Sequence, residues 1–108
     1  MKASITALIT AAGLALAGGT SAADPRAGEA LAKSSGCFAC HTLDKKTVGP
    51  AYKDIAAKYR ASKGAEADLI KKVKAGGKGV WGDIPMPPNA HIKDGDIKAM
   101  VQWVLSIK

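Results

Sequence analysis

The chain has 108 residues, a formal net charge of +7 at pH 7, and 16 Lys and Arg residues against 9 Asp and Glu. This length allows one domain and excludes a multidomain architecture. A basic chain of this size invites a nucleic-acid interpretation, but only Lys45-Lys46 and Lys71-Lys72 are adjacent basic pairs. Charge that is spread in this way suits a protein partner with an acidic docking patch better than a phosphate backbone. The composition therefore disfavours nucleic-acid binding.

Residues 1–23 have the pattern of a secretory signal peptide. A lysine gives a positive start, an apolar stretch follows, and Ser21 and Ala23 occupy the −3 and −1 positions before Asp24. We expect cleavage after Ala23 and export to the periplasm, where little nucleic acid is available. The apolar stretch has about 15 residues, whereas a membrane-spanning helix needs about 20. An uncleaved anchor is the alternative, but we expect no membrane span in the mature form, residues 24–108.

The mature domain has few bulky side chains with which to build a core. It spans 85 residues with a formal charge of +6, and the whole chain contains one Phe, two Tyr and two Trp. Domains of this size often need a disulfide, a metal or a cofactor to fold stably. The composition therefore predicts that something other than side chains fills the centre, and a porphyrin, which is a large flat apolar disc, would do so.

Helical periodicity accounts for much of the first half of the mature domain. Asp24-Pro25 is a favourable helix start, with Asp as the N-cap and Pro at the first helical position. This helix is expected to end at residues 34–36, and its apolar face consists of Ala27, Ala30 and Leu31. Apolar side chains at i, i+3, i+4 and i+7 indicate a second helix, and these are Tyr52, Ile55, Ala56 and Tyr59.

The second half has two further helices with a loop between them. One helix spans about residues 65–75, stops at two glycines, and turns inward Leu69, Ile70 and Val73. The last helix starts near Asp94, and its apolar face consists of Ile97, Met100, Val101, Trp103, Val104, Leu105 and Ile107. Residues 77–90 contain three prolines and no periodicity, so we expect an ordered loop. Since no segment alternates as a strand would, the chain is predicted to be all-α.

Residues Cys37-Phe38-Ala39-Cys40-His41 have the Cys-x-x-Cys-His spacing by which haem c is attached. The two thiols are spaced to add across the two vinyl groups of the macrocycle, and His41 is then held beneath the iron as the proximal ligand. Three alternatives compete: a structural disulfide, a thioredoxin-like pair, which would follow a strand, and a zinc site, which needs four ligands. The chain has no strand pattern and one other histidine. The motif therefore predicts one covalently attached haem c with its iron.

The second axial ligand must come from farther along the chain, and the mature domain offers two methionines. Met100 falls within the periodic pattern of the last helix, where core packing is the expected role. Met86 lies between Pro85 and Pro87-Pro88, which restrain the backbone on both sides and could aim a thioether at a fixed point. Because His/Met ligation is a known arrangement in cytochromes c, we predict Met86 as the distal ligand, with His91 as the alternative.

These motifs resemble the short monohaem class I cytochromes c of the bacterial cytochrome c-551 type. The resemblance covers nearly all of residues 24–108. It rests on the segments C-F-A-C-H, V-G-P-A-Y-K-D-I-A-A-K-Y, G-V-W-G-D-I-P-M-P-P-N and W-V-L-S. It implies a small class I cytochrome c fold, in which about four short helices wrap around one covalently bound haem.

The resemblance also implies three roles that the residues alone do not establish. The Pro50 carbonyl should accept a hydrogen bond from the His41 ring N–H and so fix the orientation of the ring. The indole N–H of Trp81 should reach a haem propionate, and the Asn89 amide should contact the Met86 sulfur. From the residues alone, the favoured interpretations are simpler: a turn proline, a packing tryptophan and a polar loop side chain.

The expected function is that of a soluble periplasmic one-electron carrier, not an enzyme, because two protein ligands leave no iron position for a substrate. Its partners would be redox proteins of a respiratory chain, an electron donor and a terminal reductase or oxidase, with partly electrostatic docking. We expect a monomer that binds no nucleic acid. The alternative is a haem enzyme or gas-binding haem protein with a labile sixth ligand. Cytochromes c′ are of this kind, but their haem motif lies near the C-terminus.

Overall fold

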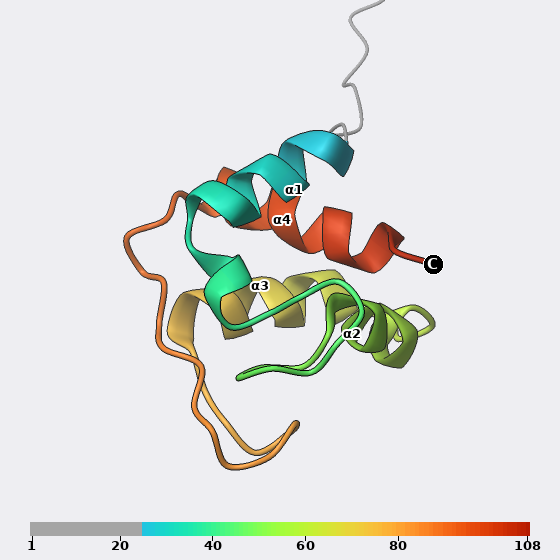
Figure 1. The fold of residues 1–108 in the computed structure, drawn as a ribbon. Coiled ribbons are helices and arrows are strands. Elements are labelled where there is room, and N and C mark those ends of the chain that lie inside the picture. Colours follow the sequence, from blue (N-terminus) through green and yellow to red (C-terminus); the bar gives the residue numbers. More distant parts are fainter. Residues whose placement is uncertain (1–24) are drawn as a thin grey trace, which may run out of the picture.

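Residues 25–108, which the computed structural model describes, form four α-helices and one short 3-10 helix, with no β-strand in that range (Figure 1). The helices are α1 (Pro25–Ser34), η1 (Cys37–Ala39), α2 (Tyr52–Tyr59), α3 (Ala65–Ala75) and α4 (Asp94–Ser106). The all-α prediction and the four expected helices are confirmed. The predicted signal peptide, its cleavage site and the Asp24 helix cap lie outside the described residues. Among those described, no helix has the length and apolar character needed to cross a membrane.

A close crossing of α1 and α4 organises the fold (Figure 1). A Cβ on Gly28 would lie 2.3 Å from the Ala99 carbonyl oxygen and 2.6 Å from the Trp103 Cβ, so the two helices meet where α1 has no side chain. Ala32, one turn later, is also buried. The face of α1 expected from the sequence was therefore wrong in part, since Leu31 is half-buried but Ala27 and Ala30 are exposed.

The hydrophobic core is small and lies along α4. Its buried members on this helix are Ile97, Met100, Val101 and Trp103, as the apolar pattern predicts. They pack with Ala32, Tyr52 and Ile92, and with half-buried side chains that include Leu69, Ile70 and Val73 of α3. Ile97 is the largest side chain that is fully buried within residues 25–108. So small a core leaves the centre of the domain to be filled by something else.

The proline-rich segment between α3 and α4 is an ordered loop, as predicted, and backbone hydrogen bonds hold it. The Gly77 N–H donates to the Met86 carbonyl at 3.0 Å, and the Met86 N–H donates to the Gly77 carbonyl at 2.8 Å. Nearer the tip, the Gly79 N–H donates to the Gly82 carbonyl at 2.8 Å. The loop therefore leaves α3 and returns alongside itself (Figure 1), and Met86 sits in the returning arm opposite Gly77.

Candidate haem site

A tight turn after α1 places the two cysteines and the histidine. Gly36 has a φ of 81°, in the left-handed region that favours glycine, and it turns the chain from α1 into η1. The backbone N–H groups of Cys40 and His41 both donate to the Cys37 carbonyl, at 3.2 Å and 3.0 Å. Because the turn is fixed by these bonds, both thiols and the imidazole line the same cavity.

The His41 ring is oriented by the backbone of the loop that follows it. Its Nδ1 lies 2.8 Å from the Pro50 carbonyl oxygen. A carbonyl can only accept, so Nδ1 carries the proton and Nε2 keeps a lone pair available for a metal. A Cβ on Gly49 would lie 2.6 Å from the His41 Cε1, so glycine is what lets the loop come this close. The hydrogen bond implied for Pro50 is therefore present.

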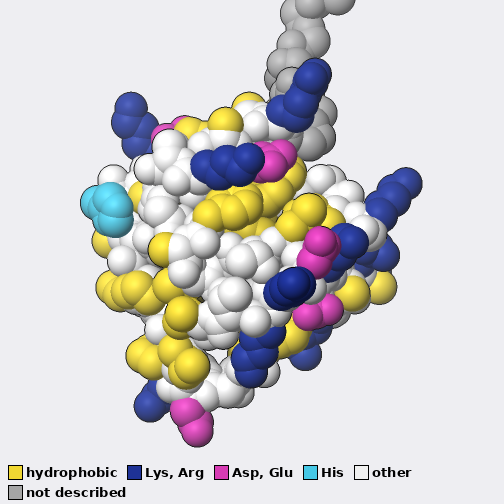
Figure 2. Space-filling model, viewed as in Figure 1, with side chains coloured by type: hydrophobic (Ala, Val, Ile, Leu, Met, Phe, Trp, Pro, Cys, Tyr) yellow, Lys and Arg dark blue, Asp and Glu magenta, His cyan; other side chains and the backbone are white. Residues whose placement is uncertain are grey.

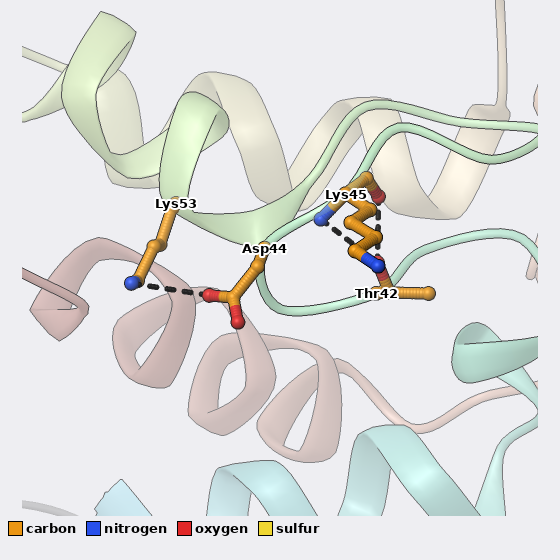
Figure 3. Close-up of polar contacts among 4 residues, drawn as sticks. All are labelled: Thr42, Asp44, Lys45 and Lys53. Atoms are coloured by element: carbon orange, nitrogen blue, oxygen red, sulfur yellow. Dashed lines mark hydrogen bonds and ion pairs between the residues drawn. The ribbon is translucent and has the colours of Figure 1, made fainter.

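The loop between His41 and Pro50 has a turn of its own (Figure 3). The Thr42 hydroxyl donates to the Lys45 carbonyl at 2.6 Å and accepts from the Lys45 N–H at 3.1 Å. Asp44 pairs with Lys53 of α2 at 3.1 Å. An exposed ion pair of this kind contributes about 0–1 kcal/mol, so the hydrogen bonds set the course of this loop more than the charges do.

Met86 is positioned by restrictions on the backbone at both ends of its loop. Gly76, at the end of α3, has a φ of 72°, and a Cβ there would lie 2.4 Å from the Met86 carbonyl oxygen. Any side chain at Gly76 would push the returning arm of the loop away. Pro85, Pro87 and Pro88 limit the φ angles on either side of the methionine. The Met86 side chain, which is half-buried, lines the same cavity as His41.

One cavity of about 330 Å³ brings these groups together. Its size falls in the range of about 300–1,000 Å³ that is usual for ligand and cofactor pockets. The wall is mostly apolar and includes Leu69, Val73, Met100, Val101 and Val104. Two thiols, an imidazole with a free nitrogen and a thioether stand in this apolar wall, and such a donor set matches covalent attachment and axial ligation of haem. The residues present therefore fit a haem.

Trp81 lines the cavity and is 39% exposed. The Lys58 Nζ lies 5.7 Å from the centre of the Trp81 ring and 5.8 Å from that of Tyr59. Such contacts between a cation and an aromatic face are worth about 0.5–1 kcal/mol at exposed sites. They connect the tip of the Met86 loop to α2. The contact of the indole N–H with a propionate stays a prediction.

Asn89 connects the end of the Met86 loop to α3. Its Nδ2 donates to the Val73 carbonyl at 3.1 Å and to the Pro87 carbonyl at 3.2 Å. Its backbone N–H lies within hydrogen-bond distance of the Val73 and Lys74 carbonyls, at 3.2 Å and 3.1 Å. Asn89 thus satisfies carbonyls at the C-terminal end of α3 that the helix itself leaves free. Its expected contact with the Met86 sulfur stays a prediction.

The two residues that compete with Met86 for the distal position, His91 and Met100, lie in different surroundings. His91 is exposed and is not part of the cavity wall. Met100 reaches the cavity wall, but it is 4% exposed and packed within the core cluster of α4. This packing is the role that the sequence predicts for Met100, and it leaves Met86 as our candidate for the distal position.

Comparison with known proteins identifies the family. The sequence model of the cytochrome c family matches residues 25–108. The chain is 52% identical over 100 residues to cytochrome c-551 of Pseudomonas aeruginosa, covering 93% of this chain and 92% of that protein. It is 56% identical over 77 residues to cytochrome c-551 of Allochromatium vinosum, covering 71% and 82%. The chain belongs to the cytochrome c family.

Solved structures agree with this assignment. The crystal structure of cytochrome c552 from Nitrosomonas europaea matches this cytochrome c with a TM-score of 0.72 at 51% identity, covering 74% of this chain and 99% of that one. The class 1 cytochrome MtoD from Sideroxydans lithotrophicus matches with a TM-score of 0.66 at 37% identity, covering 80% and 98%. The predicted class I fold, the c-551 type and a covalently bound haem c with its iron are confirmed.

The environment of Cys37 argues against a dithiol oxidoreductase. Burial raises the pKa of the Cys37 thiol above its usual value, whereas reactive cysteines have a lowered pKa and keep a thiolate at neutral pH. A raised pKa is the opposite of what thiol–disulfide exchange favours, and both thiols lie in the wall of the cavity.

Tyr52 is a cavity residue that sequence reasoning assigned only to a helix face. Its ring stacks on His41 with centroids 5.3 Å apart and meets Trp103 edge-on at 4.9 Å. Its hydroxyl is buried without a hydrogen-bond partner among the described residues, and burial raises the pKa of this phenol. Helical periodicity reports that Tyr52 faces inward, but nothing in it tells a cavity wall from a packed core.

Proposed function

We propose that this cytochrome c is a soluble periplasmic one-electron carrier that works as a monomer, with His41 and Met86 as axial ligands. The observation that carries this proposal is the shared cavity, whose wall contains both side chains and both thiols. The haem supplies a ferric–ferrous couple when bound. An imidazole nitrogen and a thioether sulfur from the chain would leave no coordination position for a substrate, and the thioether favours the ferrous form. Electron transfer without catalysis is the function that remains.

Positive and apolar side chains near the cavity support docking of a redox protein. Lys46 and Lys78 are exposed and line the cavity. Val80 and Ile84, in the Met86 loop, are 51% and 62% exposed. Figure 2 shows hydrophobic side chains gathered over this loop, with charged side chains beside them. Such a surface suits an acidic partner, either an electron donor or a terminal reductase or oxidase, that binds briefly through charge and apolar contact.

The rate of electron transfer to an acidic redox protein, measured at several ionic strengths, tests both the carrier function and the mode of docking. The rate should fall by roughly tenfold or more as salt rises from low to physiological ionic strength, because the Debye length shrinks from about 30 Å to about 8 Å. Stopped-flow spectroscopy of the holoprotein measures this rate. Lys46→Gln with Lys78→Gln should lower the low-salt rate. Lys98→Gln, on an exposed position of α4 outside the cavity wall, is the control.

Two results would count against this proposal. The absence of any electron exchange would contradict the carrier function. A rate that ionic strength leaves unchanged would show that docking is apolar.

The N-terminal pattern supports export to the periplasm. The P. aeruginosa relative aligns over 100 residues, more than the 85 that follow Ala23, so the likeness extends into residues 1–23. The chain expressed from Asp24 with only an initiator Met should carry no covalent haem in a host without cytosolic attachment machinery. Mass spectrometry of the intact protein measures loading, with the full-length chain as the control. Full loading of the truncated chain would mean that export is not needed.

A further inference from the structure

Two hydrogen-bond donors meet at the carbonyl of Cys40, next to the proximal histidine. The Thr47 hydroxyl donates to this oxygen at 2.7 Å, and the Gly49 N–H donates to it at 2.7 Å. The Thr47 N–H in turn donates to the Gly49 carbonyl at 3.1 Å. Thr47 therefore joins the residue before His41 to the residue before Pro50.

Protein side chains pack little against this loop, because residues 43–48 are all exposed, and of these only Lys46 and Val48 line the cavity. The loop must nevertheless bring the Pro50 carbonyl to 2.8 Å from the His41 Nδ1, with Gly49 against the imidazole ring. Where apolar contacts are few, side-chain hydrogen bonds to the backbone can fix a loop. The hydroxyl of Thr47 makes the bond that ties the middle of this loop to the haem-attachment turn.

We propose that Thr47 is a positioning residue for the proximal ligand, which holds the Pro50 carbonyl against His41 and thereby tunes the reduction potential. This inference rests on the proposed axial role of His41. An acceptor on Nδ1–H makes the imidazole a more basic ligand, and a more basic ligand favours the ferric state. Loosening the loop should weaken that hydrogen bond, reduce the basicity of His41 and raise the potential.

The substitution Thr47→Val removes the hydroxyl while it keeps the shape of the side chain. In the holoprotein, the His41 Nδ1–H should exchange with solvent about fivefold faster, as expected for the loss of one ordinary hydrogen bond. The reduction potential should shift upward. Nuclear magnetic resonance and a redox titration measure the two effects. Thr47→Ser keeps the hydroxyl and should restore both values to those of the parent.

Thr42→Val is the matched control in the same loop (Figure 3). Within residues 25–108 its hydroxyl bonds only to Lys45, so its loss should lower thermal stability without changing the exchange of the His41 proton or the potential. If Thr47→Val also lowers only stability, Thr47 is structural and the inference is wrong.

A second measurement needs no variant. In the parent protein the Thr47 hydroxyl proton should exchange slowly with solvent, and free exchange would overturn the inference. A parent protein that lacks covalent haem, or that lacks the charge-transfer band from the methionine sulfur to ferric iron, would instead count against the proposed function. The two failures are therefore distinguishable.

Discussion

Met86→Ala should turn this electron carrier into a haem protein that binds carbon monoxide. Loss of the thioether would open the sixth position or leave it to water, so the ferrous variant should bind carbon monoxide readily while the parent resists it. The reduction potential should fall by some part of the roughly 0.8 V over which axial ligands tune haem. Absorbance spectroscopy under carbon monoxide and a redox titration measure these changes. A parent that binds the gas freely would favour the alternative function, a gas-binding haem protein.

Met100→Leu is the matched control for this prediction. Met100 is 4% exposed in the core of α4, and a Met-to-Leu change conserves volume, so it should cost less than about 1.5 kcal/mol of stability. Neither gas binding nor potential should change. If Met100→Leu binds carbon monoxide and Met86→Ala does not, the distal ligand has been assigned to the wrong methionine.

The double substitution of Cys37→Ala and Cys40→Ala should leave a largely disordered chain without haem. The cavity of about 330 Å³ is bounded by core side chains. At about 24 cal/mol per Å³, an empty enclosed cavity of this size would cost on the order of 8 kcal/mol. Solvent entry through its mouth reduces that cost, yet the whole stability of a domain is only about 5–15 kcal/mol. Circular dichroism and thermal melting of the purified variant measure the effect.

The single substitution Cys37→Ala is the control, because one thioether can still hold the haem. It should retain helix content and a cooperative melt. A cooperative transition with native-like helix content in the haem-free double variant would show that side chains alone sustain the fold.

The helices and the attachment motif could be predicted because their signals are local. The apolar period of 3.6 residues predicts both α3 and α4 closely. The glycines after Ala75 mark the end of α3. The Cys-x-x-Cys-His spacing is likewise complete within five residues of sequence. Met86 could be predicted as the distal ligand because the neighbouring prolines restrict the backbone locally. Each of these signals describes what a short segment does by itself.

Close approaches between distant backbones could not be predicted, because glycine carries no apolar signal. The pattern of α1 pointed to its alanine methyl groups, whereas the contact with α4 forms where Gly28 has no side chain. Gly76 was predicted as a helix stop, but its approach to the Met86 carbonyl is visible only in space. The bond from Thr47 to the Cys40 carbonyl joins residues that no periodicity relates. Each of these three contacts depends on how segments separated in the sequence come together in the folded chain.

The central claim, that Met86 and His41 ligate the iron of a covalently attached haem, is tested most directly by the charge-transfer band from sulfur to ferric iron. Visible spectra of the ferric parent, Met86→Ala and Met100→Leu should be recorded side by side. We predict that the band is present in the parent and in Met100→Leu and is absent in Met86→Ala. A band that persists in Met86→Ala and disappears in Met100→Leu, or that is missing from the parent, would contradict the account.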